Sequence, residues 1–247
     1  MAALFAMPFA LHAGASESCD SIVLERRLCR IEYFEGTLYG APCIGTSIFR
    51  FSALDESNPI SFTDDVNYRI RGFKPTPFAL YINRGTSIEK YYPAAGVRET
   101  VYAAGDIVSF DLTDAEEVIL ADRQKQELIF LDFAFQKKYV IANIAVEDLQ
   151  WRDGLLYVLA KNRIHLYDEH GNLVETKAIP ERCNRIRATT DELLIFSEKA
   201  RCVFKSDTAW SRIELPFTVL DICEKNDGFL ILDGPGATLY ICRRSSF

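Results

Sequence analysis

The chain has 247 residues, 49% of them hydrophobic, so it is long enough to bury a sizeable core within one domain. Its 28 Lys and Arg residues are outnumbered by 35 Asp and Glu residues, which gives a net charge of -7. No polybasic run offsets this charge, so we expect no nucleic-acid partner. No stretch approaches the ~20 apolar residues of a transmembrane helix, so no transmembrane segment is predicted.

The first fifteen residues, MAALFAMPFALHAGA, are apolar and end in Ala13-Gly14-Ala15, a small-x-small pattern typical of a signal peptidase site. No Lys or Arg precedes the apolar run, although a complete signal peptide carries one. Residues 1–15 therefore have two interpretations, a signal peptide or an apolar tail. The first predicts a periplasmic or secreted protein, and the second leaves a cytoplasmic one.

A unit of four short strands separated by tight turns occupies residues 146–179. Asp153-Gly154 supplies the positive φ that a hairpin turn needs. The strand LLYVLA behind this turn has no polar face, as expected for a strand buried on both sides. Pro180 ends the unit, because proline cannot donate a hydrogen bond to a strand ladder.

Close relatives of this unit recur along the chain with a period near 40 residues. The apolar second strands begin at residues 38, 78, 118, 155, 193 and 229, which are spaced 40, 40, 37, 38 and 36 residues apart. The first strands keep the same period, with aligned apolar residues at Ile31, Ile70, Ile107, Leu149, Ile186 and Ile222. A period near 40 built from four short strands is typical of a β-propeller blade.

We therefore predict an all-β fold, a six-bladed β-propeller of four-stranded antiparallel blades. Residues 16–247 form one domain in this prediction, and its blades start near residues 28, 66, 105, 146, 184 and 219. The last blade has room for three strands only, whereas residues 20–26 belong to no complete blade. We expect residues 20–26 to supply the missing outer strand and so to close the ring.

This closure would place Cys19 or Cys29 near Cys242, at a separation that a disulfide can bridge. The chain has seven cysteines, so at least one is unpaired, and most are expected to be small buried apolar residues. No C-x-x-C pair occurs and the chain has three histidines, so no zinc site is predicted.

The repeats resemble the NHL-like group of six-bladed propellers, particularly the exported propellers of bacteria. The similarity covers residues 20–247 and rests on a turn followed by an apolar strand, as in RDGLLYVLAKNRIHLYDEHGNLV and NDGFLILDGPGATLYIC. The WD dipeptide and the double glycine of kelch repeats are absent. Blade one matches least well, because Asn58-Pro59 stands where a strand should begin.

Charged residues stand directly before the aligned apolar residues of all six first strands. Side chains alternate along a strand, so the residues two positions further on also face the central channel. The residues of the first set are Arg30, Arg69, Asp106, Asp148, Arg185 and Asp221. The polar residues of the second set are Glu32, Arg71, Gln150 and Arg187, while Val108 and Cys223 occupy its other two positions. The ten charged or polar residues are the candidate ligand-binding residues.

Two interpretations of these charges remain open. In the first, the Arg side chains bind a carboxylate or phosphate, while the Asp side chains bind hydroxyls or a cation. In the second, opposite charges pair across a narrow channel and neutralise one another. The sequence favours neutralisation, since buried charges require partners.

The predicted function is a non-catalytic binding or scaffolding role, without cofactor, for a monomer that takes a protein or a small polar ligand at its face or channel. The alternative is a metal-dependent hydrolase that resembles the gluconolactonase-like propellers, whose Glu, Asn and Asp ligands hold one divalent metal. Arg residues in the same ring would repel a cation, so no metal ligand is predicted. No catalytic residue is predicted either, because no G-x-S-x-G motif occurs and the three histidines form no nucleophile-base pair.

Overall fold

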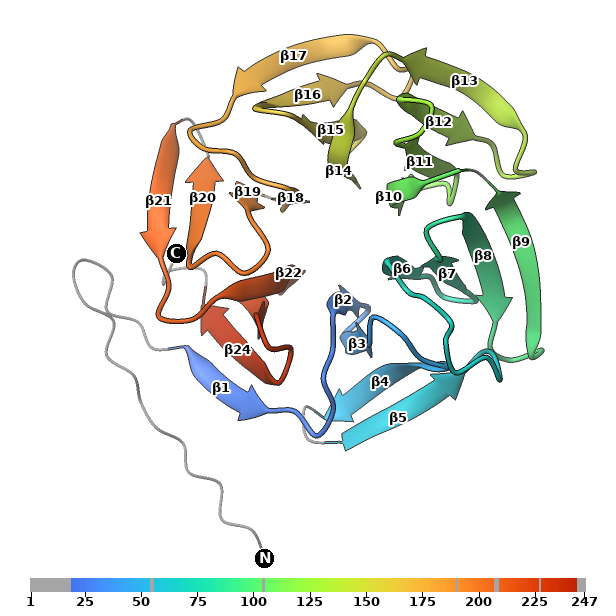
Figure 1. Ribbon diagram of the computed structural model, residues 1–247, viewed down its shortest axis with the longest axis vertical. Helices are drawn as coiled ribbons and strands as arrows, with labels where there is room; N and C mark the ends of the chain where they lie inside the picture. The colour runs from blue at the N-terminus through green and yellow to red at the C-terminus, as the bar shows by residue number, and fades with distance from the viewer. Residues whose placement is uncertain are drawn as a thin grey trace, which may run out of the picture.

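Six four-stranded antiparallel sheets stand in a ring around a central channel, so the chain is a six-bladed β-propeller, as predicted (Figure 1). The computed structural model describes residues 19–243, except for 54–55, 104, 190, 207–208 and 227. The apolar leader predicted at residues 1–15 lies outside the described residues. Within the described ranges there is no helix, and so none long and apolar enough to cross a membrane.

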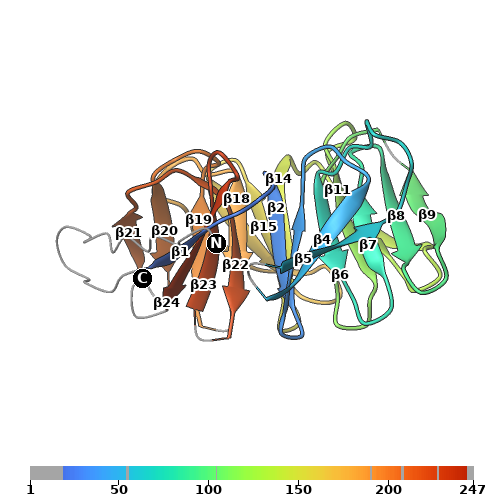
Figure 2. The same ribbon diagram turned by 90° about the horizontal axis from the view of Figure 1, so that it is seen from below.

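The first strand of each blade faces the channel and the fourth lies at the rim, and the blades run between two faces of the ring (Figures 1 and 2). Blades one to three consist of β2 (Arg30–Phe34), β3 (Thr37–Ala41), β4 (Ser47–Ala53) and β5 (Glu56–Ser61); β6 (Gly72–Pro75), β7 (Leu80–Asn83), β8 (Ser87–Tyr92) and β9 (Val97–Ala103); and β10 (Ile107–Leu112), β11 (Val118–Asp122), β12 (Glu127–Leu131) and β13 (Lys137–Ala142). Blades four to six consist of β14 (Val146–Arg152), β15 (Leu155–Ala160), β16 (Arg163–Tyr167) and β17 (Leu173–Ala178); β18 (Arg185–Ala188), β19 (Leu193–Phe196), β20 (Cys202–Ser206) and β21 (Trp210–Glu214); and β22 (Val219–Lys225), β23 (Gly228–Asp233), β24 (Thr238–Arg243) and β1 (Asp20–Val23).

The second strands lack a polar face because neighbouring blades cover both of their sides. β7, β11, β19 and β23 are buried along their whole length. The hairpin that precedes β15 has the predicted geometry, with Asp153 at φ 51° and Gly154 at φ 76°. Turn chemistry and strand burial therefore repeat together around the ring.

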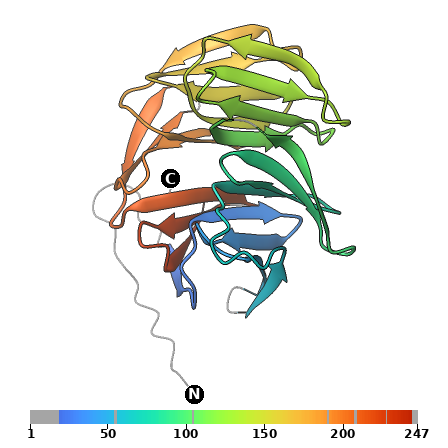
Figure 3. The same ribbon diagram turned by 45° about the vertical axis from the view of Figure 1, so that its right-hand side comes forward.

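β1 closes the ring by pairing with β24, where Ile22 lies opposite Leu239. Figures 1 and 3 show the blue N-terminal strands beside the red C-terminal ones. A disulfide joins Cys19 to Cys242 across this pair, which confirms the predicted closure and one of its two predicted cysteine partners. The ends of the propeller are thus joined by hydrogen bonds and by a covalent bond.

Cys29 pairs with Cys43 within blade one, a second disulfide that the sequence pattern did not predict. The expectation that most cysteines are small apolar core residues is therefore wrong, because four of the seven form disulfides. Cys183 and Cys223 do fit that expectation, since both are free and buried.

Blade one has its fourth strand in spite of Asn58-Pro59. Pro59 lies within β5 opposite Phe49 and is exposed. β5 is the outermost strand and pairs with β4 alone, so a residue without an N–H is tolerated there.

The first strand of blade two starts later than the repeat spacing predicts. β6 begins at Gly72, and Phe73 rather than Ile70 lies opposite the second strand, where its partner is Ile82. Ile70 donates its N–H to the carbonyl of Cys43 in blade one instead. Ile70 and Phe73 stand three residues apart in the sequence, so both fit a period that is only approximate.

Blade three shows the same shift of three residues. Phe110, opposite Leu120, takes the place predicted for Ile107, and a β-bulge separates Ile107 from Ser109. β14 and β22 carry bulges at the same place, and these align Ser109 with Asp148 and Asp221. Ile107 and Phe110 stand three residues apart, so both fit the approximate period.

Candidate functional site

Seven of the ten predicted ligand-binding residues lie in first strands, and three do not. Arg69 and Arg71 precede β6, and Asp106 precedes β10. The register places Gly72, Lys74, Ser109 and Asp111 at the corresponding channel positions. The alignment of Arg69, Arg71 and Asp106 with the other blades is therefore corrected by three residues. Phe73 and Phe110 fit the approximate period as well as Ile70 and Ile107 do. This second fit is the sequence signal that points to the missed residues, which flank Phe73 and Phe110.

The corrected alignment gives two rings of channel side chains. We call the first the entry ring, because it lies near the starts of the first strands, and the second the inner ring. The entry ring consists of Arg30, Gly72, Ser109, Asp148, Arg185 and Asp221. The inner ring consists of Glu32, Lys74, Asp111, Gln150, Arg187 and Cys223.

Two buried carboxylates of the entry ring connect neighbouring blades. Asp221 accepts a hydrogen bond from the N–H of Ile31 in blade one (3.1 Å), and Asp148 accepts one from the N–H of Ile186 in blade five (3.1 Å). Asp221 is 0% exposed and Asp148 is 2% exposed. The same side chain thus satisfies a backbone donor of the next blade at two equivalent junctions.

The inner ring repeats this connection one level deeper. Gln150 accepts a hydrogen bond from the N–H of Ala188 (2.7 Å), and Asp111 accepts one from the N–H of Trp151 (3.0 Å). These contacts give Gln150 and Asp111 a structural role between blades three, four and five. A sequence pattern does not reveal it, because the donors belong to the backbone.

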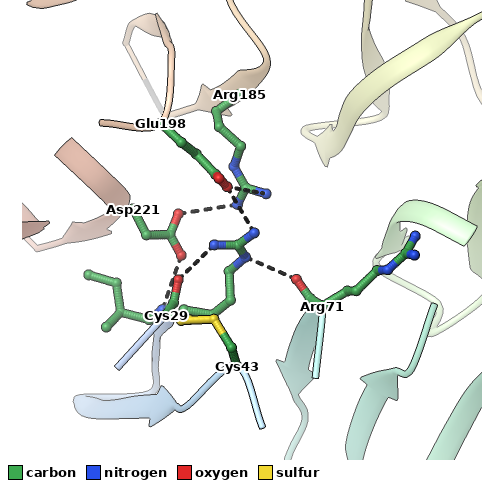
Figure 4. Close-up of a disulfide and its surroundings, with 8 residues drawn as sticks. Cys29, Cys43, Arg71, Arg185, Glu198 and Asp221 are labelled. Atoms are coloured by element: carbon green, nitrogen blue, oxygen red, sulfur yellow. Dashed lines mark hydrogen bonds and ion pairs between the residues drawn. A yellow bond between two sulfur atoms is a disulfide. The ribbon is translucent and has the colours of Figure 1, made fainter. Parts of the chain in front are cut away.

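The arginines of blade five lie between the two buried carboxylates. Arg185 lies 3.2 Å from Asp221 (Figure 4) and 3.4 Å from Asp148. Arg187 contacts the same two carboxylates. Burial by itself raises the pKa of Asp221, but Arg187, Arg185 and Arg30 together hold that pKa below its usual range. Asp221 is therefore a carboxylate at neutral pH, with its charge balanced locally.

Arg30 is held from several sides at the entry ring. Its guanidinium donates to the carbonyl of Cys29 (2.7 Å), to the carbonyl of Arg71 (2.9 Å) and to Glu198 (2.9 Å). Burial and the neighbouring Arg185 lower the pKa of Arg30. The side chain of Arg71 points away from this cluster (Figure 4) and pairs with Asp106.

Lys74 occupies the inner ring between Glu32 (3.2 Å) and Asp111 (3.3 Å). Burial alone would lower the pKa of Lys74, but Asp111 and Glu32 raise it, so the ammonium group stays charged. Burial raises the pKa of Glu32, and Lys74 and Arg187 oppose this effect. Lys74 therefore balances two carboxylates of the inner ring, while Arg187 pairs with Asp148 and Asp221 of the entry ring.

These side chains close the channel at its centre. The cavity between the two rings measures about 30 Å³, which is enough for about two water molecules. A larger hollow opens at each end of the first strands. Within the channel, any ligand larger than water would therefore bind at one of the two mouths.

The mouth at the ends of the first strands, which we call the opposite mouth, has a volume of about 240 Å³ and is balanced in charge. Three basic side chains line it, Lys74, Arg152 and Arg187, and three acidic ones, Glu32, Asp111 and Glu224.

The mouth at the starts of the first strands is larger, about 750 Å³, and is strongly basic. Its acidic side chains are Glu147 and Glu198. Seven basic side chains line this hollow, which we call the basic mouth: Arg30, Arg69, Arg71, Arg123, Lys161, Arg182 and Arg185. Of these, Arg69 and Arg71 lie directly before β6, and Arg123 lies in the turn after β11.

Arg69 and Lys161 are the cations of the basic mouth that are most available to a ligand. Both are exposed, and neither forms an ion pair within the described part of the chain. Arg123 pairs with Asp106 (3.6 Å), and Arg182 pairs with Glu147 (3.4 Å). Arg182 is 81% exposed, so its pair is screened by water and easily exchanged.

The carboxylates of the channel do not converge on one point. Asp148, Asp221 and Glu32 are each paired with Arg or Lys, and Asp106 lies outside the first strands. Among the described residues, no group of three or more His, Cys, Asp or Glu side chains is arranged to hold a metal ion.

Comparison with known proteins reveals the fold alone. No protein-family model matches the chain, and no curated protein matches it. A streptogramin B lyase matches with a TM-score of 0.66 and 11% identity over 90% of this chain and 86% of that chain. Virginiamycin B lyase from Staphylococcus aureus matches with 0.65 and 10% over 92% and 84%. The WD40 propeller domain of Doa1 matches with 0.64 and 13% over 88% and 79%.

These similarities support a six-bladed propeller fold. The similar structures include both lyases and a WD40 domain. They do not distinguish the NHL-like group from other propellers.

Proposed function

We propose that the protein is a non-catalytic binding propeller that holds an anionic group of a protein or of a small polar ligand at its basic mouth. The observation that carries this proposal is the charge asymmetry of the two mouths. Seven cations face two carboxylates around a hollow of about 750 Å³, on a chain whose net charge is -7. A cleft lined by one sign of charge concentrates the field and attracts the opposite charge.

The mouth is a better candidate than the channel core. The side chains of the channel core form hydrogen bonds with each other and with neighbouring blades, whereas Arg69 and Lys161 are exposed at the mouth. Guanidinium groups bind carboxylates and phosphates in a bidentate manner, which suits an anionic ligand. The candidate role of Asp148 and Asp221 then becomes structural, because they position the arginines around the mouth.

An oxidising compartment is part of the proposal. Two disulfides close the ring and brace blade one, and such bonds persist in the periplasm and outside the cell. With the apolar leader of residues 1–15, the disulfides support export of the protein. That the protein is a monomer and that it belongs to the NHL-like group are further parts of the proposal. The acidic net charge argues against nucleic acid as the bound anion.

A protein partner is compatible with the known propellers. Structures similar to this chain include a propeller in complex with ARL6 (TM-score 0.62) and a chain of the mitotic checkpoint complex (TM-score 0.64). A virginiamycin B lyase is also known as an inactive histidine-to-alanine variant with quinupristin. In this chain the described histidines, His165 and His170, lie in β16 and in the turn behind it, away from the first strands. No contact of the described residues supports the alternative of a metal-dependent hydrolase.

Capture of a partner from a native cell-envelope extract tests the proposal. The variant Arg69→Glu with Lys161→Glu reverses two charges at the basic mouth, and we expect it to lose at least 90% of the bound material. The control Arg50→Glu with Lys137→Glu makes the same change of charge on exposed positions of β4 and β13. Equal capture by the two double variants would contradict the proposed site.

A further inference from the structure

A second hollow adjoins the basic mouth on the same face of the ring. It has a volume of about 470 Å³ and shares Ala145 and Lys161 with the basic mouth. We call it the outer groove. Its lining comes from the turn after β11, the linker before β14 and the hairpin between β15 and β16, namely Gln126, Asn143, Ile144, Ala145, Ala160, Lys161, Asn162, Arg163 and His165. The two hollows together run from the channel toward the rim at the junction of blades three and four.

The outer groove combines amides with cations. Gln126, Asn143 and Asn162 are exposed, and their side chains make no hydrogen bond within the described ranges of the chain. Arg163 and Lys161 are exposed and form no ion pair with another described residue. An amide side chain both donates and accepts, which is the pattern a sugar hydroxyl requires.

The composition of the lining excludes two classes of ligand. Among the described residues, no Phe, Tyr or Trp lines the basic mouth or the outer groove. A single-stranded nucleic acid relies on aromatic stacking of its bases, which this lining does not offer. The apolar side chains of the groove are Ile144, Ala145 and Ala160, and Ile144 is buried, so a peptide anchor would find no deep apolar pocket.

We propose that the basic mouth and the outer groove together bind an acidic oligosaccharide. Its carboxylate, sulfate or phosphate groups lie among the cations of the mouth, and its hydroxyls contact the amides of the groove. This inference rests on the proposed function, and it adds both the ligand class and the second half of the site. The two adjoining hollows, of about 750 and about 470 Å³, together exceed the roughly 300–1,000 Å³ of a pocket for one small ligand, and this favours several linked sugars over one small anion.

His165 lines the groove as an uncharged side chain that is hydrogen-bonded to Thr176. Its Nδ1 lies 3.1 Å from the hydroxyl oxygen of Thr176. Burial and the nearby Arg163 lower the pKa of His165, so the imidazole is neutral at physiological pH. Binding should therefore change little between pH 6.5 and 8, where the Arg and Lys side chains also keep their charge.

Calorimetric titration with defined probes tests this inference. The probes are an oligogalacturonide, a sulfated oligosaccharide of the same length, the methyl-esterified oligogalacturonide and oligoglutamate of equal charge. We expect the uronate or the sulfated probe to bind, the neutral ester to bind at least tenfold more weakly, and oligoglutamate to bind more weakly than the better sugar. The better of the two acidic sugars identifies the charged group.

A groove variant separates this inference from the proposed function. Asn143→Gly with Asn162→Ala removes two amides, and Gly keeps the left-handed φ of 62° at position 143 without strain. We expect this variant to bind the acidic sugar about 10-fold more weakly, with unchanged binding of inorganic pyrophosphate. Sugar binding that is unaffected by the variant, or weaker than oligoglutamate binding, overturns the inference and leaves the anion site in place. If pyrophosphate also binds the Arg69→Glu, Lys161→Glu variant normally, the proposed function fails as well.

Discussion

Replacing Asp221 with asparagine removes one charge from the entry ring while keeping the size of the side chain. The fully buried carboxylate accepts hydrogen bonds from the N–H groups of Ile31 and Ile222 and pairs with Arg185 and Arg187. The amide oxygen of asparagine can still accept one of these bonds. Its NH₂ group must face either the two guanidinium groups or the N–H of Ile31, which are all donors. In both orientations two buried cations lose a counter-charge.

The expected loss of stability follows from this geometry. Removing one partner of a buried, hydrogen-bonded ion pair costs about 3–5 kcal/mol. For a domain of this length such a loss lowers the melting temperature by roughly 6–20 °C. Asp221→Asn should therefore unfold at a clearly lower urea concentration than the parent protein, as followed by tryptophan fluorescence.

Asp106→Asn is the matched control. Repeat spacing aligns Asp106 with Asp221, but Asp106 is 29% exposed in its pair with Arg71. A pair of this exposure contributes at most about 1 kcal/mol. Equal losses for the two variants, or a loss below about 1 kcal/mol for Asp221→Asn, would refute both the corrected register and the role of Asp221 between blades six and one.

The pH dependence of the same variant has a defined sign. The folded-state pKa of Asp221 lies below its unfolded value near 3.9, so the stabilisation from its charge is complete above that pH. It is lost as the pH falls through the lower, folded-state value. The difference in unfolding free energy between parent and Asp221→Asn should thus be constant from pH 7 to 5 and shrink below about pH 4. A difference that grows on acidification would contradict this assignment.

Three further predictions concern the ring and the alternative chemistry. Cys19→Ser opens a loop with a sequence separation of 223 residues and should cost about 5 kcal/mol, whereas Cys43→Ser opens one of 14 residues and should cost about 3 kcal/mol. Both losses should disappear when parent and variants are compared in reductant; equal losses without reductant would count against the chain-entropy explanation. Deleting residues 20–23, the strand β1, should lower the melting temperature and expose β24 to amide hydrogen exchange, and a deletion variant that melts like the parent would exclude ring closure by β1. Calcium or zinc at millimolar concentration should leave the melting temperature unchanged, while a rise that Asp148→Asn abolishes would favour the hydrolase.

The architecture could be predicted because it repeats. The sequence contains six apolar second strands, each with a turn in front of it, such as Asp153-Gly154 before β15. Their regular spacing would not arise by chance in a chain of this composition. The closing strand followed from counting strands, and the closure limited the partner of Cys242 to Cys19 or Cys29, of which Cys19 forms the disulfide. Cys29–Cys43 has no such signal, since the loop that brings Cys43 back to Cys29 belongs to the least regular blade.

The site was harder to predict because alternation along a strand amplifies small errors of register. A shift of three residues exchanged Lys74 for Arg71 and Ser109 for Asp106, although the fold was unaffected. The basic mouth was not predicted either. Lys161, Arg123 and Arg182 come from turns and linkers that are far apart in the sequence, and the ring brings them together.

The location of an anion on the folded protein is the most direct test of the binding proposal. Titration of the isotope-labelled protein with inorganic pyrophosphate, followed by amide chemical shifts, maps the site residue by residue. We predict saturable shifts in residues 161 and 182–185 at the basic mouth, and none in residues 150–152 and 188–189 at the opposite mouth. Shifts at the opposite mouth, or no saturable shift at the basic mouth, would contradict the account.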